Sequence, residues 1–293
     1  MTLAVAVIMT LTASEILLRR HVVPNDSFEV ARQVYRTGGT PFAAFGDSRI
    51  ESGVRGSTQL ANFGTRSDSL ETVLGKAAAW LARNPHGQAI IALPPQQFSS
   101  QRLGADQSAL LEDFLSEDDA TLQILRQNYR RYLLEYANVV LTDPAILWRK
   151  PVVQADTATQ SATFADKPEN TRKAEAERRI QHHTPIQGFG ASAAARTLRQ
   201  RLQELHDTGA GICLVTMPVS SAYQNAGSLE PAFAESRALV NRIAREIAVP
   251  YFDLWDDYPD TLFRDPDHLH PDGAIIVTRD ILERCKSRAG TSS

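Results

Sequence analysis

The chain has 293 residues, of which 43% are hydrophobic and 22% are charged, and its formal net charge is −3. This composition is typical of a globular protein with a sizeable core, and slight acidity without a basic stripe argues against a nucleic-acid partner. Two cysteines are too few to frame a disulfide-rich fold. Cys213 lies in an apolar run, where we expect a free buried thiol; a single bridge to Cys285 is the alternative in an oxidising compartment.

Residues 1–18 form a membrane-like apolar stretch. As a helix they extend roughly 27 Å at about 1.5 Å per residue, close to the hydrocarbon thickness of a bilayer. Glu15 interrupts the run, and the basic pair Arg19-Arg20 follows it, so the pattern lacks the positive start of a cleaved signal peptide. Taken literally, the positive-inside rule places the body of the protein in the cytoplasm. The stretch is therefore read either as a membrane anchor or as a buried first helix.

Compact apolar runs alternate with longer helical patterns along the rest of the chain. The apolar runs predict strands at Pro41–Phe45, Gln59–Phe63, Gln88–Leu93, Gly211–Met217 and Pro250–Leu254. The helical patterns predict helices at Ser69–Arg83, capped by Ser67 or Asp68, and at Ser108–Leu115, Thr121–Tyr136, Ser192–His206, Glu230–Ile247 and Gly273–Arg288. This alternation predicts a three-layer α/β/α fold around a mostly parallel sheet.

Residues 151–185 differ from their surroundings. They are rich in Thr, Ala, Gln, Lys and Glu, and Phe164 is their single aromatic residue. A segment of this composition offers little apolar surface to bury. We therefore predict a mobile surface insertion between two parts of one sheet.

The segment Gly46-Asp47-Ser48-Arg49 directly follows the first predicted strand. A strand-to-helix turn exposes a serine at the carboxyl edge of a sheet and directs free backbone N–H groups at an anion there. The hydroxyl becomes a nucleophile when a neighbouring base takes its proton. Arg49 is expected to form a surface salt bridge; contact with an anionic acceptor or acyl carrier is the alternative.

Two Asp–His pairs with the same spacing lie near the C-terminus: Asp265 with His268, and Asp267 with His270. A catalytic histidine needs a carboxylate that fixes its tautomer and stabilises the imidazolium. A solvated acidic loop and a metal site are alternatives, but no further His or Cys lies nearby, so no metal ligand set is predicted. Asn62-Phe63-Gly64 ends the second predicted strand, where the glycine is either an ordinary turn or an oxyanion donor.

Together, these motifs resemble the SGNH/GDSL hydrolase superfamily. Gly46-Asp47-Ser48 is similar to its nucleophile block, Asn62-x-Gly64 to its second block, and Asp265-x-x-His268-Leu269-x-x-x-Gly273 to its last block. The family places Leu directly after the catalytic histidine, which selects His268 over His270. The resemblance implies a flavodoxin-like domain over residues 41–288, with the triad Ser48, His268 and Asp265 and with Gly64 as an oxyanion donor.

The third block of the family, Gly-x-Asn-Asp, is absent. Its Asn completes the oxyanion hole, whereas here the third strand runs into Leu93-Pro94-Pro95-Gln96-Gln97. We expect the oxyanion to be bound by the backbone N–H groups of Ser48 and Gly64, with Gln96, or else Gln97, in place of the missing Asn.

This departure, together with the apolar N-terminus, resembles a membrane-tethered bacterial branch that adds or removes acyl groups on envelope and secreted polysaccharides. The resemblance implies a serine esterase acting on acyl esters of a carbohydrate, above all O-acetyl esters, without a cofactor or metal. The expected partners are an acylated carbohydrate or acyl carrier and, through residues 1–20, the inner membrane, with the catalytic domain in the periplasm. An O-acyltransferase and a catalytically inactive glycan-binding or assembly protein are the alternatives.

Overall fold

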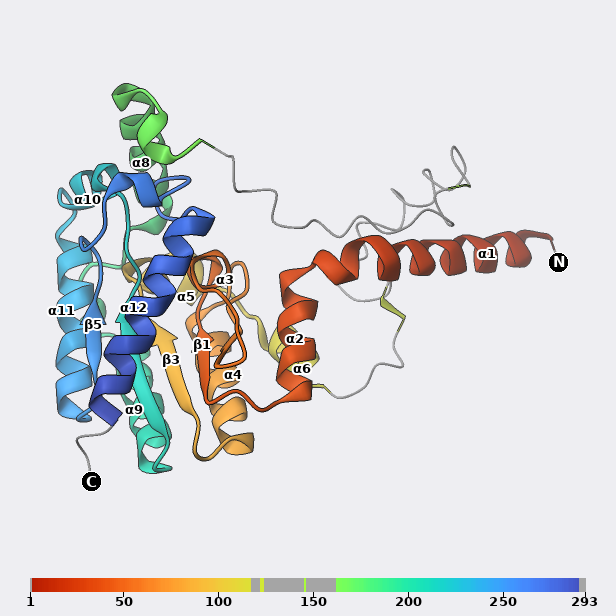
Figure 1. Ribbon diagram of the computed structural model, residues 1–293, viewed down its shortest axis with the longest axis horizontal. Helices are drawn as coiled ribbons and strands as arrows, with labels where there is room; N and C mark the ends of the chain where they lie inside the picture. Colours follow the sequence, from red (N-terminus) through yellow and green to blue (C-terminus); the bar gives the residue numbers. More distant parts are fainter. Residues whose placement is uncertain (1, 117–121, 124–144, 146–161, 290–293) are drawn as a thin grey trace.

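A five-stranded parallel sheet forms the centre of the protein, in the order β2-β1-β3-β4-β5 (Figure 1). The computed structural model describes residues 2–116, 122–123, 145 and 162–289. Each strand lies within a predicted one: β1 (Phe42–Phe45), β2 (Leu60–Asn62), β3 (Gln88–Ala92), β4 (Gly211–Thr216) and β5 (Tyr251–Asp253). The predicted α/β class with a parallel sheet is confirmed.

Helices cover both faces of this sheet. Successive strand residues point to opposite faces, so Ala43 and Phe45 enter one core while Ala44 enters the other. The first core packs against α2 (Ser27–Thr37), α4 (Leu70–Arg83), α6 (Ser108–Leu115), α9 (Ala193–Asp207) and α11 (Pro231–Glu246). The second packs against α3 (Ser48–Gly53) and α12 (Pro271–Ala289). The molecule is therefore a three-layer α/β/α sandwich.

Five of the predicted helices are confirmed, as α4, α6, α9, α11 and α12, with ends within two residues of those expected. The predicted helix Thr121–Tyr136 lies outside the described residues. The cap of α4 differs from the prediction, because the Oγ of Ser69, not a group of Ser67 or Asp68, accepts the N–H of Thr72 at 3.3 Å. Asp68 is instead turned inward, where its carboxylate binds Lys76 Nζ at 2.7 Å.

The N-terminal residues form α1 (Thr2–Leu17), which projects away from the sandwich (Figure 1). Apolar side chains on it are exposed, including Ile8 at 63% and Met9 at 66%. Within the described part of the chain, no helix is both long enough and apolar enough to cross a membrane. The membrane anchor at residues 1–20 stays a prediction.

Residues 151–161 of the predicted insertion lie outside the described residues, and the mobility of the segment 151–185 stays a prediction. Residues 162–185 contain a short turn at Phe164–Asp166 and the helix α8 (Glu169–His183). Phe164 is fully buried in the second core, while Ala176 and Ile180 pack against Tyr223 of α10 (Ser221–Gly227). These few apolar residues suffice because they lie on one helix face at a spacing of four.

A disulfide joins Cys213 and Cys285, so the expectation of a free buried thiol at Cys213 is wrong. Cys213 is on the face of β4 that α12 covers, and this packing brings the two Cα atoms to 5.9 Å, a separation that a disulfide spans. The bond links the sheet directly to the helix that follows the C-terminal loop.

Loss of this disulfide should lower the free energy of unfolding by about 2–4 kcal/mol, because the bond closes a loop of 72 residues in the unfolded chain. Denaturant titration with and without dithiothreitol measures the effect. The double variant Cys213→Ala/Cys285→Ala is the matched control and should not respond to the reductant. An equal stability of the oxidised and reduced wild type would contradict the prediction.

Candidate active site

The order of the strands sets the position of the candidate site. In the chain, β2 follows β1 on one side of it, and β3 then pairs with its other side. This reversal leaves a crevice at the carboxyl edge of the sheet, where doubly wound α/β proteins bind their ligands. Ser48 lies there, as the first residue of α3 directly after β1.

A tight turn presents Ser48. The turn requires a glycine at position 46, because the Cβ of any other residue there would lie 2.4 Å from Ile50 Cγ1, which is a clash. Asp47 caps α3, and its Oδ1 accepts the N–H of Arg49 at 3.1 Å. Burial raises the pKa of Asp47, but the positive charges of Arg49 and Arg102 outweigh it and hold that pKa below the usual value. The N–H of Ser48 has no acceptor within α3, because the first N–H groups of a helix have none.

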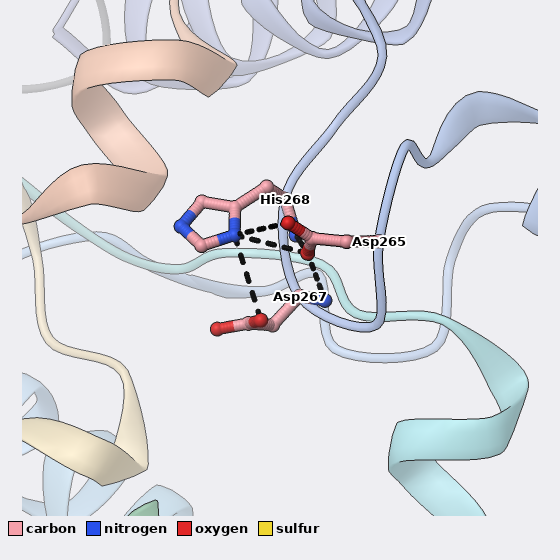
Figure 2. Close-up of side chains that lie close together, drawn as sticks. All are labelled: Asp265, Asp267 and His268. Atoms are coloured by element: carbon pink, nitrogen blue, oxygen red, sulfur yellow. Dashed lines mark hydrogen bonds and ion pairs between the residues drawn. The ribbon is translucent and has the colours of Figure 1, made fainter. Parts of the chain in front are cut away.

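His268, from the C-terminal loop, contacts Ser48 at this turn. Its Nε2 lies 2.9 Å from Ser48 Oγ, although the two residues are 220 positions apart in the sequence. Its Nδ1 lies 3.0 Å from both carboxylate oxygens of Asp265. Figure 2 shows Nδ1 facing the carboxylates and Nε2 pointing away from them. The three residues selected from the sequence therefore form one continuous Ser–His–Asp arrangement.

The loop itself holds Asp265 in place. The Oδ1 of Asp265 accepts the backbone N–H groups of Asp267 at 3.1 Å and of His268 at 2.9 Å. Burial raises the pKa of Asp265, yet the hydrogen bond and charge of His268 outweigh it and keep that pKa well below the usual range. Asp265 is thus ionised at neutral pH, as a group that orients an imidazole must be.

His270, the member of the second Asp–His pair, does not reach Ser48. It is 5% exposed, and its Nδ1 accepts the N–H of Asp272 at 3.4 Å at the start of α12. The structure thus brings His268, and not His270, to the serine.

Asp267 is the centre of a buried ionic network. Its Oδ2 lies 3.3 Å from Nη2 of Arg49, and its Oδ1 lies 3.2 Å from Nε of Arg179 on α8. Arg49 is only 2% exposed and also donates to the hydroxyl of Tyr223 at 3.1 Å. The expected surface salt bridge of Arg49 is therefore wrong: the side chain turns inward because a buried carboxylate and a phenol receive it.

The ligand atoms of Asp265, Asp267 and His268 lie within 4.8 Å of one another, which is compact enough for a metal ion (Figure 2). Two guanidinium groups already contact these carboxylates, however: Arg49 binds Asp267, and Arg179 binds both Asp267 and Asp265. A further cation there would meet two fixed positive charges. The arrangement fits a carboxylate pair that orients an imidazole better than it fits a metal site.

His183 of α8 completes the network. Its Nδ1 lies 2.9 Å from the hydroxyl of Tyr223 and 3.7 Å from Asp267 Oδ2. Burial lowers the pKa of His183 to about 4, and the positive charges of Arg49 and Arg179 act in the same direction, whereas Asp267 opposes them. The imidazole is therefore neutral at physiological pH.

Two of the three predicted oxyanion donors already donate to other groups of the protein. The N–H of Gly64 already donates to Asn62 Oδ1 at 2.9 Å. Gln96 lines the cleft beside Ser48, but its Nε2 donates to Asp47 Oδ2 at 3.1 Å. Gln97 turns away and donates to the carbonyl of Asp68. The N–H of Ser48 has no such competitor in α3, and the oxyanion roles of Ser48, Gly64 and Gln96 stay predictions.

The cleft around Ser48 has a volume of about 380 Å³. Sequence reasoning missed several of its residues: Arg179 and His183, because their segment was assigned to a surface insertion, and Arg66, Arg102 and Arg264, which stand in no motif. The spacing of Ala176 and Ile180, four residues apart, is the sequence signal that could have revealed α8. All lining residues in the described part of the chain are polar or charged: Asp47, Ser48, Glu51, Arg66, Ser67, Gln96, Arg102, Arg179, His183, Arg264, Asp265, Asp267 and His268.

Asp265→Asn should lower Ser48-dependent ester hydrolysis by ~10⁴-fold, because an amide no longer favours the imidazole tautomer that accepts the serine proton. The measurement is kcat/KM with p-nitrophenyl acetate. His270→Ala is the control and should change kcat/KM by less than about tenfold, since its side chain contacts α12 and not Ser48. An equal loss of kcat/KM in both variants would contradict the assignment of His268, rather than His270, as the base.

Acidification should destabilise the protein through His183. Its folded pKa of about 4 is below the ordinary value of 6.5, so between these values the unfolded chain binds more protons, and stability falls as pH falls. At about 1.4 kcal/mol per pKa unit the loss approaches about 3 kcal/mol by pH 4. Urea unfolding at pH 7 and pH 4 of the wild type and of His183→Gln measures it. The same pH dependence in both proteins would be the contrary result.

The chain matches no protein-family model and no curated protein. The resemblance of its three motifs to the SGNH/GDSL superfamily therefore stays a prediction.

Proposed function

We propose that this protein is a serine esterase that cleaves acyl esters, above all O-acetyl esters, of a carbohydrate. One observation carries the proposal: His268 bridges Ser48 Oγ, at 2.9 Å, and the carboxylate of Asp265, at 3.0 Å. A hydroxyl, an imidazole and an ionised carboxylate in this order are the groups that acyl transfer through a serine requires.

In the proposed reaction, Ser48 Oγ attacks the acyl carbonyl carbon while His268 Nε2 takes the hydroxyl proton. Asp265 keeps the other ring nitrogen protonated and stabilises the imidazolium. The Ser48 N–H, at the start of α3, donates to the oxyanion. His268 then returns its proton to the leaving sugar oxygen, which gives an acyl-Ser48 ester. Water, deprotonated by His268, hydrolyses this ester and releases the carboxylic acid and free Ser48.

The lining of the cleft supports a polar substrate with a short acyl group. Its described residues carry hydroxyl, amide, imidazole, carboxylate or guanidinium groups, and none is apolar. Such walls provide hydrogen-bond partners for the hydroxyl groups of a sugar, whereas a long acyl chain would leave them without partners.

Two features support an action outside the cytoplasm, at a membrane. The disulfide between Cys213 and Cys285 is a bond that persists in oxidising compartments such as the bacterial periplasm. The exposed apolar residues of α1, among them Val7 and Ile8, are suited to contact with a lipid or protein surface. We propose that residues 1–20 anchor the protein to the inner membrane.

The oxyanion site supports a second candidate, a glycan-binding protein that keeps the fold without turnover. The N–H of Gly64 is held by Asn62, and the amide of Gln96 by Asp47. Removal of one oxyanion donor costs ~10²–10³ in rate. A sugar hydroxyl in place of water would convert the same acyl-enzyme into an acyltransferase, which needs the same triad.

A fluorophosphonate probe should label the wild type at Ser48, and Ser48→Ala should abolish both labelling and the hydrolysis of p-nitrophenyl acetate. The expected loss in kcat is at least ~10⁴-fold, because Ser48 forms the covalent bond. Labelling is read by intact-protein mass spectrometry.

Ser52→Ala is the matched control for this experiment. Ser52 lies one turn further along α3, and its hydroxyl donates to the carbonyl of Ser48 at 2.8 Å, without lining the cleft. This variant should keep its labelling. Folded wild type that neither reacts with the probe nor hydrolyses the ester would support the glycan-binding candidate and end the esterase proposal.

A further inference from the structure

Arginines from four separate segments line the cleft around Ser48. Arg66 follows β2, Arg102 belongs to α5 (Ser100–Leu103), Arg179 to α8, and Arg264 directly precedes Asp265. The chain as a whole has a net charge of −3, so this gathering of positive charge is a local property. Only the guanidinium groups that lack a close carboxylate partner are available to bind an anionic ligand.

The buried carboxylates of the cleft account for two of the arginines. Asp47 is 1% exposed and lies 3.8 Å from Arg102, while its other neighbours are Arg49 and Gln96. Arg179 contacts Asp265 and Asp267, as described above. Arg102 and Arg179 therefore compensate charges that belong to the catalytic arrangement itself.

Arg66 and Arg264 remain at the rim. Arg66 is 79% exposed at its side chain and lies 3.7 Å from Glu51, a contact that solvent screens strongly. Arg264 is exposed, and in the described part of the chain no carboxylate lies within ion-pair distance of it. Its backbone is fixed, because its N–H donates to the carbonyl of His268 at 3.0 Å. Among the described residues, Arg264 is thus an arginine without a carboxylate partner that lines the cleft of Ser48 and His268.

We propose that the cleft selects an acidic carbohydrate, in which Arg264, assisted by Arg66, binds a carboxylate or phosphate group of the sugar portion of the ester. This inference rests on the proposed esterase function and names its substrate class. Arginine presents paired donors that match the oxygens of either anion. The rim position of both arginines fits the sugar portion, which extends out of the cleft, and not the acyl carbon, which must reach Ser48.

Binding to the full-length Ser48→Ala protein, measured by isothermal titration calorimetry, tests the proposal without turnover. The ligands are a tetragalacturonate, a phosphorylated oligosaccharide of the same length and a neutral tetragalactose. At least one acidic ligand should bind about tenfold or more tightly than the neutral one, and its charged group identifies the anion. Raising the salt from about 50 to 300 mM should weaken binding of the acidic ligand only.

Arg264→Gln, added to Ser48→Ala, should reduce affinity for the acidic ligand about tenfold and leave affinity for the neutral ligand unchanged. Arg66→Gln should lower the affinity for the acidic ligand by a smaller factor, because the guanidinium of Arg66 already lies 3.7 Å from Glu51. Arg242→Gln is the matched control, since Arg242 is an exposed arginine of α11 outside the cleft. It removes the same charge and should change nothing.

Equal affinity for acidic and neutral ligands, binding of neither, or an Arg264→Gln variant that behaves like the control would overturn the inference. Failure of the proposed function is distinguishable from this result. Wild type that prefers acidic glycans but hydrolyses no ester contradicts the esterase alone. Wild type that hydrolyses p-nitrophenyl acetate through Ser48 without any preference for acidic ligands contradicts the inference alone.

Discussion

The contact between Ser48 Oγ and His268 Nε2 is the constraint on which the rest of the site depends. It joins segments 220 positions apart, and only the parallel sheet brings them to one edge. Ser48 is fixed by the short turn after β1. His268 reaches it from the far edge strand because the C-terminal loop folds back over the sheet, with the carbonyl of Pro266 accepting the N–H of Ser220 at 3.0 Å. Two backbone features therefore bring Ser48 and His268 together: the turn after β1 and the hydrogen bond between Ser220 and Pro266.

A buried ionic network connects α8 to Ser48 and His268. Asp267 is 3% exposed, so its carboxylate needs partners, and Arg49 of α3 and Arg179 of α8 provide them. Removal of one partner from such a network is costly, because the remaining charge stays buried without compensation. The carboxylate of Asp267 therefore connects the C-terminal loop to both α3 and α8. This explains why α8, with few apolar residues of its own, takes a defined place beside the cleft.

The sequence predicts the sandwich and the contact between Asp265 and His268 well because both depend on local patterns. The strands show as compact apolar runs, and Asp265 and His268 are close in the chain, so their contact needs no knowledge of the fold. The contact of His268 with Ser48 spans 220 positions and is expected only from the resemblance of the motifs. Two features that the sequence did not reveal depend on distant partners. Arg49 is buried because Asp267 and Tyr223 meet it, and Cys213 pairs with Cys285 because α12 crosses β4 at that point. Neither partner is visible from the neighbouring residues.

Asn62 has a structural role that its motif does not state. The resemblance makes Gly64 the oxyanion donor of the Asn62-x-Gly64 block, and Asn62 Nδ2 itself lies within 3.2 Å of the carbonyls of Ile50, Glu51 and Val54. These carbonyls lie at the end of α3, where the last C=O groups of a helix lack donors within it; that of Ile50 also accepts the N–H of Val54 at 3.1 Å. Asn62 Oδ1 meanwhile receives the N–H of Gly64. Asn62 therefore fixes the end of the helix that begins at Ser48 and also holds the N–H of Gly64, while the oxyanion roles of Ser48 and Gly64 stay predictions.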